Sequence, residues 1–87
     1  YLRQGAKKQM NYTKEFGKYI RACRKEAGIS QETFAEKCDL STRQISNIET
    51  GRCEPKLSTI FKMCEACNIS FDGFMKELTL LFRPDIL

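Results

Sequence analysis

One segment in the middle of the chain carries side chains suited to hydrogen bonding with the edges of nucleic-acid bases. Ile45 and Ile48 are three residues apart, which is the spacing of the buried side of a helix. The hydrogen-bonding side chains around them are Thr42, Arg43, Gln44, Ser46 and Asn47. Arginine can donate two hydrogen bonds to guanine, Asn or Gln can bridge adenine, and Thr offers a hydroxyl and a methyl group. We therefore predict that these five side chains contact base pairs.

A second set of residues has the chemistry of phosphate binding. Ser30 and Gln31 open a predicted helix, where free backbone N–H groups and the positive end of the helix dipole favour an anion. Cationic side chains lie before and after the base-contacting segment of residues 42–48, at Arg21, Arg52 and Lys56. Contacts to phosphate position a protein on a duplex without distinguishing its sequence. We predict that these five residues contact phosphates.

Catalytic and metal-binding chemistry have little support. The chain has no histidine, which excludes a histidine general base and every zinc site that needs one. We therefore expect neither enzymatic activity nor a cofactor. The five cysteines are Cys23, Cys38, Cys53, Cys64 and Cys67, and we expect free thiols that pack as small apolar residues. The spacing Cys64-x-x-Cys67 leaves a metal or redox role as an alternative, but zinc would need two further ligands, so we expect no metal.

The charge of the chain is uneven. The net charge is +4, yet residues 1–28 carry eight Lys or Arg against two Glu, and the remainder is nearly balanced. Such asymmetry attracts polyanions, either nucleic acid or an acidic membrane surface. No apolar stretch reaches the length of a membrane span, so we expect a cytoplasmic protein without a membrane partner.

Length and periodicity predict one all-α domain of five helices. Eighty-seven residues leave room for a single core. Apolar residues recur at helical spacing over residues 13–27, 31–38, 42–49, 57–68 and 71–78. We expect N-caps at Thr13, Ser30 and Ser41. The predicted inner side of the fourth helix consists of Leu57, Ile60, Phe61 and Cys64.

The same patterns divide the chain into three parts. We interpret residues 1–12 as a flexible arm, partly introduced by cloning, with a natural start at Met10. Residues 13–79 form the domain, and residues 80–87 form an apolar tail. The tail residues Leu80, Leu81, Phe82, Ile86 and Leu87 exceed what a five-helix core requires, which favours homodimerisation. Folding of the tail onto its own core is the alternative.

Residues 28–51 resemble the helix-turn-helix of the lambda-repressor-like family, also called the Cro/C1 or XRE type, and the resemblance extends over roughly residues 16–78. The matching positions are Arg24, Gly28, Ile29, Ser30, Gln31, Phe34, Ala35, Ile45, Ile48, Glu49 and Gly51, and the match continues through Pro55, Leu57 and Ile60. The resemblance implies a compact five-helix bundle whose third helix enters the DNA major groove. It also implies a phosphate contact by Gln31 and a semi-buried ion pair between Arg24 and Glu49.

The resemblance further implies a bacterial or phage transcription regulator, most simply a repressor or autoregulator. Two copies would bind an inverted-repeat operator with half-sites about 10 to 10.5 base pairs apart. Activation through RNA polymerase stays open, with Glu36 and Asp39 available for that contact. The alternative of another class is an antitoxin or adaptor that acts mainly on a protein such as a cognate toxin.

Overall fold

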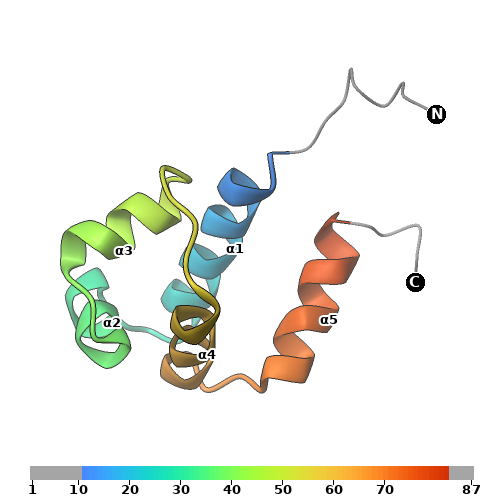
Figure 1. Cartoon of the computed structure of the whole chain (residues 1–87). Coiled ribbons are helices and arrows are strands. Elements are labelled where there is room, and N and C mark those ends of the chain that lie inside the picture. The colour runs from blue at the N-terminus through green and yellow to red at the C-terminus, as the bar shows by residue number, and fades with distance from the viewer. Residues whose placement is uncertain (1–10, 83–87) are drawn as a thin grey trace.

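The computed structural model describes residues 11–82, which form five α-helices (Figure 1). They are α1 (Tyr12–Glu26), α2 (Gln31–Cys38), α3 (Thr42–Glu49), α4 (Leu57–Ala66) and α5 (Phe71–Phe82). Within these residues no strand is present, so the all-α prediction is confirmed. α2 and α3 lie together against α1 and α4, and α5 packs on the opposite side of that pair. None of the five helices is both long and apolar enough to span a bilayer.

The beginning of α1 differs from the prediction. Asn11, and not Thr13, is the N-cap: its side chain accepts a hydrogen bond from the Lys14 backbone N–H at 3.1 Å. Both residue types can cap a helix, and the apolar spacing does not distinguish them. Tyr12, assigned to the arm, therefore lies in the first turn of α1.

The end of α5 also differs, and it moves the predicted boundary of the tail. Leu80, Leu81 and Phe82 continue α5 instead of leaving it. The stretch from Phe74 to Phe82 contains neither Gly nor Pro, so nothing in it ends the helix. Phe82 packs against the core, and its ring lies 5.1 Å from that of Tyr12. The alternative that the tail folds onto its own core therefore applies to Phe82. Ile86 and Leu87 lie outside the described residues.

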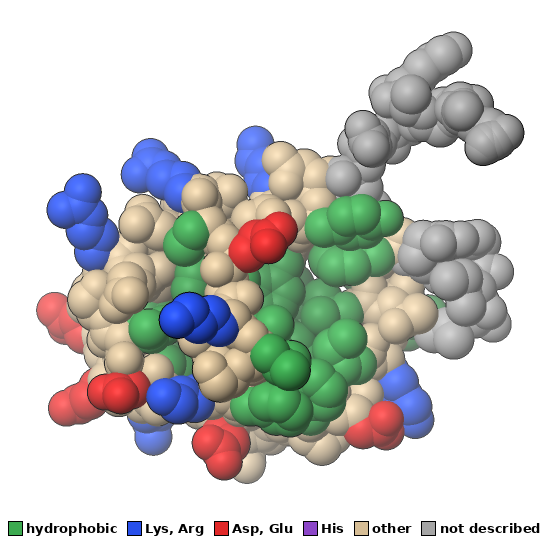
Figure 2. Space-filling view, in the orientation of Figure 1, with side chains coloured by type: hydrophobic (Ala, Val, Ile, Leu, Met, Phe, Trp, Pro, Cys, Tyr) green, Lys and Arg blue, Asp and Glu red, His purple; other side chains and the backbone are tan. Residues whose placement is uncertain are grey.

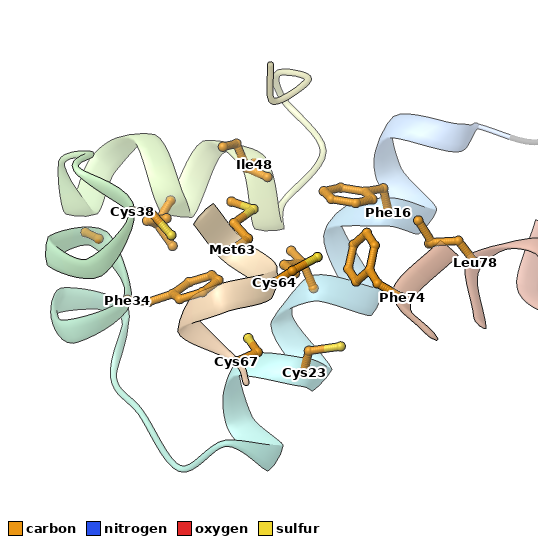
Figure 3. Close-up of a cluster of buried hydrophobic side chains, with 13 residues drawn as sticks. Phe16, Cys23, Phe34, Cys38, Ile48, Met63, Cys64, Cys67, Phe74 and Leu78 are labelled. Carbon is orange, nitrogen blue, oxygen red and sulfur yellow. The ribbon is translucent and has the colours of Figure 1, made fainter. Parts of the chain in front are cut away.

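The core draws on all five helices. Ile20, Phe34, Ile45, Met63 and Phe74 are completely buried, one from each helix. Phe34, Met63 and Phe74 are labelled in Figure 3. Four of the five cysteines are buried among them, and Cys53 is exposed. Burial raises the pKa of the Cys38 thiol to about 11 and that of Cys67 to about 12.

The fourth helix shows that periodicity alone misassigned two apolar residues. Leu57 and Phe61, predicted to face inward, are 63% and 46% exposed. The buried residues of α4 are instead Met63 and Cys64. Phe61 stacks on Phe71 of α5, with ring centroids 4.3 Å apart, which keeps part of its surface from water.

A close contact between helices sets the position of α3 relative to α1. Gly17 lies so near the backbone at the end of α3 that a Cβ there would overlap the carbonyl oxygens of Ile48 and Glu49. Gly51, just after α3, has a φ of +79°, and a Cβ there would lie 2.7 Å from Lys14 Cα. Glycine is required at both positions, because a larger residue would separate the two helices.

Candidate nucleic-acid interface

Local sequence rigidly connects α2 to α3. α2 ends at Asp39 in the left-handed conformation (φ 60°), and the Leu40 N–H bonds back to Ala35 O at 2.8 Å. Ser41 then caps α3 by accepting from the Gln44 N–H at 3.1 Å. Gln44 Oε1 accepts the Ser41 N–H at 2.8 Å in return, which completes a capping box.

α3 presents its polar residues on one side because its apolar residues are fixed on the other. Ile45 and Ile48 are buried in the core. Thr42 and Arg43 are exposed, and Ser46 and Asn47 are partly exposed. The shared outer side expected for these four residues is therefore available to a ligand.

Gln44 occupies a different position from the other four predicted base-contacting residues. It is exposed, but its carbonyl oxygen is used by the capping box. A bidentate contact to adenine needs both ends of the amide, so this conformation does not offer one. The capping role of Gln44 has its own sequence signal, a Ser at the start of a helix followed three residues later by Gln.

A cleft of about 490 Å³ joins the N-terminal ends of α2 and α3 to α1. Its lining residues are Arg21, Arg24, Ser30, Gln31, Glu32 and Thr42. Ser30 caps α2 by accepting from the Thr33 N–H at 3.1 Å. The first N–H groups of α2 have no carbonyl partner within the helix and can face an anion, with exposed Arg21 beside them.

The Gln31 side chain does not extend freely toward that cleft. Its Nε2 donates to Glu49 Oε1 at 3.0 Å, so the amide is held by the end of α3. In this conformation a phosphate contact of Gln31 would come from its backbone N–H and not from its side chain. No local sequence pattern predicts this contact, because the two residues are eighteen positions apart.

Glu49 and Arg24 form a buried ion pair. Arg24 Nε donates to Glu49 Oε2 at 2.7 Å and Nη2 to Oε1 at 3.3 Å. The third arginine contact runs from Nη1 to the backbone oxygen of Ile29 at 2.9 Å. The Arg24 and Glu49 side chains are only 9% and 1% exposed. The pair joins α1, the turn before α2, and the end of α3.

The remaining predicted phosphate contacts lie after α3. Arg52 and Lys56 are exposed, and the Arg52 N–H donates to Asn47 O at 2.8 Å. Between them, Glu54 accepts a hydrogen bond from the Thr13 hydroxyl at 3.0 Å, which ties the connecting segment to α1. Lys and Arg side chains project from the region of α3 and the upper part of α1 (Figure 2).

Hydrophobic side chains gather on a different surface, over α4 and α5 (Figure 2). Leu80 and Leu81, two of the residues predicted to support a dimer, are 52% and 42% exposed on the last turn of α5. Three further large hydrophobic side chains of α4 and α5 are exposed, which the sequence did not indicate. They are Leu57, Phe61 and Met75, each more than 40% exposed.

A paired α2 and α3 supported by three further helices defines a helix-turn-helix domain. The family model described as helix-turn-helix matches residues 20–74, so the chain belongs to this family. The predicted family resemblance is thereby confirmed. The family is one of DNA-binding regulators and not of enzymes, as the sequence led us to expect.

Several relatives are regulators by name. The immunity repressor of Bacillus phage phi105 is 37% identical over 65 residues, which cover 75% of this chain and 45% of the repressor. The transcriptional repressor RghR of Bacillus subtilis is 39% identical over 61 residues, 69% of this chain and 45% of RghR. The chain thus spans less than half the length of either relative.

The fold is also shared with a solved structure. The clp gene regulator ClgR of C. glutamicum has a TM-score of 0.70, with 82% of this chain and 90% of that chain covered. Sequence identity is 22%, so the likeness concerns the fold alone.

Proposed function

We propose that this chain is a sequence-specific, double-stranded DNA-binding transcriptional regulator, most simply a repressor or autoregulator in the cytoplasm. α3 enters the major groove with Thr42, Arg43, Ser46 and Asn47 toward the bases. The exposed side of α3, held in place by buried Ile45 and Ile48, is the observation that carries this proposal. The names of the relatives and the cations beside α3 give further support.

The decisive experiment is selection of bound duplexes from a random pool, followed by the same selection with Arg43→Ala. The wild-type protein is expected to enrich one sequence, and the variant should lose preference at one base pair, worth about 1 to 3 kcal/mol. Lys76→Ala on α5 is the matched control, since Lys76 is also an exposed cation. Enrichment of no sequence by the wild-type protein would refute the proposal.

Phosphate contacts by Arg21, Arg52 and Lys56 give the proposal a second test. The logarithm of the binding constant should fall with the logarithm of salt concentration at about −0.9 per phosphate neutralised. Replacing one of the three cations with Ala should reduce that slope by about 1 and weaken binding to all sequences alike. An unchanged slope in all three variants contradicts these contacts.

The protein is further proposed to bind an inverted repeat as a homodimer through the exposed side chains of Leu80 and Leu81, whereas Phe82 packs against its own core. Apolar surface of this extent favours burial against a second copy. Leu81→Lys should abolish the dimer in sedimentation measurements and remove the preference for a full operator over a half-site. A wild-type protein that sediments as a monomer with operator bound would overturn the dimer.

An antitoxin or adaptor is the second candidate, because Leu57, Phe61 and Met75 also expose apolar surface suited to a protein partner. A cognate toxin would be that partner, whereas a contact with RNA polymerase would use the acidic side chains of Glu36 and Asp39. If the chain binds a protein partner with an affinity that depends on Phe61 and does not change with salt concentration, this candidate is favoured over DNA recognition.

A further inference from the structure

Glu49 lies where three separate segments of the helix-turn-helix meet. Its carboxylate accepts from Arg24 of α1 and from the Gln31 side chain at the first position of α2. Arg24 also holds the Ile29 carbonyl, one residue before the cap of α2. The end of α3 and the beginning of α2 are therefore connected to each other directly by Gln31 and indirectly by Arg24.

We propose that Glu49 and Gln31 are positioning residues for DNA binding, and that their hydrogen bond fixes the beginning of α2 relative to α3. This inference rests on the proposed function. α2 offers its first N–H groups to a phosphate, while α3 offers side chains to the bases, so both contacts form together only at one relative placement. Gln31 and Glu49 act on DNA through that placement, without their side chains contacting it.

The chemistry of the site explains why the bond persists. Glu49 is almost completely buried, and a buried carboxylate needs its lone pairs occupied by donors. Arg24 occupies both oxygens, and Gln31 supplies the remaining donor to Oε1. A Gln31 side chain that moved to a phosphate would leave that oxygen with the longer, 3.3 Å arginine contact as its only partner described here.

Two substitutions remove the bond from opposite ends. Gln31→Met keeps the length of the side chain and the backbone N–H but has no donor. Glu49→Asp keeps the negative charge but withdraws the carboxylate by one methylene from both Gln31 and Arg24. Glu65→Asp, the same change on the exposed side of α4, is the matched control.

Both variants are expected to bind the selected duplex about tenfold more weakly, the effect of one misplaced hydrogen bond to phosphate. The double variant should be no weaker than Glu49→Asp alone, because Glu49→Asp already removes the contact that Gln31→Met removes. Base preference should be retained. Affinities are compared at a temperature where circular dichroism shows every variant fully folded.

A direct phosphate contact by the Gln31 side chain gives different results. Gln31→Met would then weaken binding while Glu49→Asp left it unchanged, and the Gln31 side-chain amide resonances would shift when duplex is added. Either outcome overturns the inference. If Glu49→Asp does not fold, these resonances in the wild-type protein decide the question: they should stay unmoved on binding. A wild-type protein that selects no duplex would instead refute the proposed function.

Discussion

Replacement of Glu49 by Gln tests how much the buried ion pair contributes to folding. The side chains of Glu49 and Arg24 are 1% and 9% exposed, so water cannot solvate a guanidinium left without its partner. The neutral amide places an NH₂ group where an oxygen had accepted from Arg24 or Gln31. Breaking a buried pair costs about 3 to 5 kcal/mol. In a domain of this size, each kcal/mol lowers Tm by about 4 to 8 °C.

Thermal and urea unfolding followed by circular dichroism will measure this change. A decrease in Tm of at least about 12 °C is expected, with the base preference of the folded protein retained. Glu65→Gln is the control, since this exposed carboxylate should affect stability by less than about 0.5 kcal/mol. A Glu49→Gln variant that melts within 2 °C or so of wild type would show that the pair contributes little, as surface pairs do.

Three other predictions follow from packing. Gly17→Ala should lower stability by about 1 to 3 kcal/mol in urea unfolding, because its methyl group overlaps the end of α3; an unchanged midpoint refutes this contact. Because Cys53 is the exposed cysteine, it alone should react quickly with a thiol reagent at pH 8. The free energy of unfolding should fall above about pH 9, because thiols ionise there in the unfolded chain, whereas burial raises the pKa of Cys38 to about 11 and that of Cys67 to about 12 in the folded protein. Phe82→Ala should destabilise the domain in urea unfolding, because its ring packs against Tyr12; a response confined to oligomeric state contradicts intramolecular packing.

Helix periodicity and caps made most of the fold predictable from sequence. The ranges of α2 and α3 agree with the prediction, since Ser30 and Ser41 are unambiguous caps directly before short amphipathic segments. The ends of α1 and α5 were less certain. Asn11 and Thr13 are both acceptable caps, and Leu80 to Phe82 are equally compatible with a tail or a last helical turn. Contacts with distant elements, such as that of Phe82 with Tyr12, decide such cases.

The candidate interface was predictable in its residue types but not in its hydrogen bonds. The exposed side of α3 follows from the spacing of Ile45 and Ile48 alone. The hydrogen bond from Gln31 to Glu49 does not follow from any spacing, because it depends on how α2 crosses the end of α3. No local pattern encodes that crossing.

The attachment of α3 explains how a helix of eight residues can serve as a rigid surface for recognition. In water such a helix would be largely unfolded. Here the capping box fixes its beginning, Ile45 and Ile48 fix its inner side, and Glu49 fixes its end. The side chains named here as stabilising α3 are therefore distinct from those of Thr42, Arg43, Ser46 and Asn47. Substitutions among those four should change base preference with little effect on folding, whereas substitutions among the supporting residues should do the reverse.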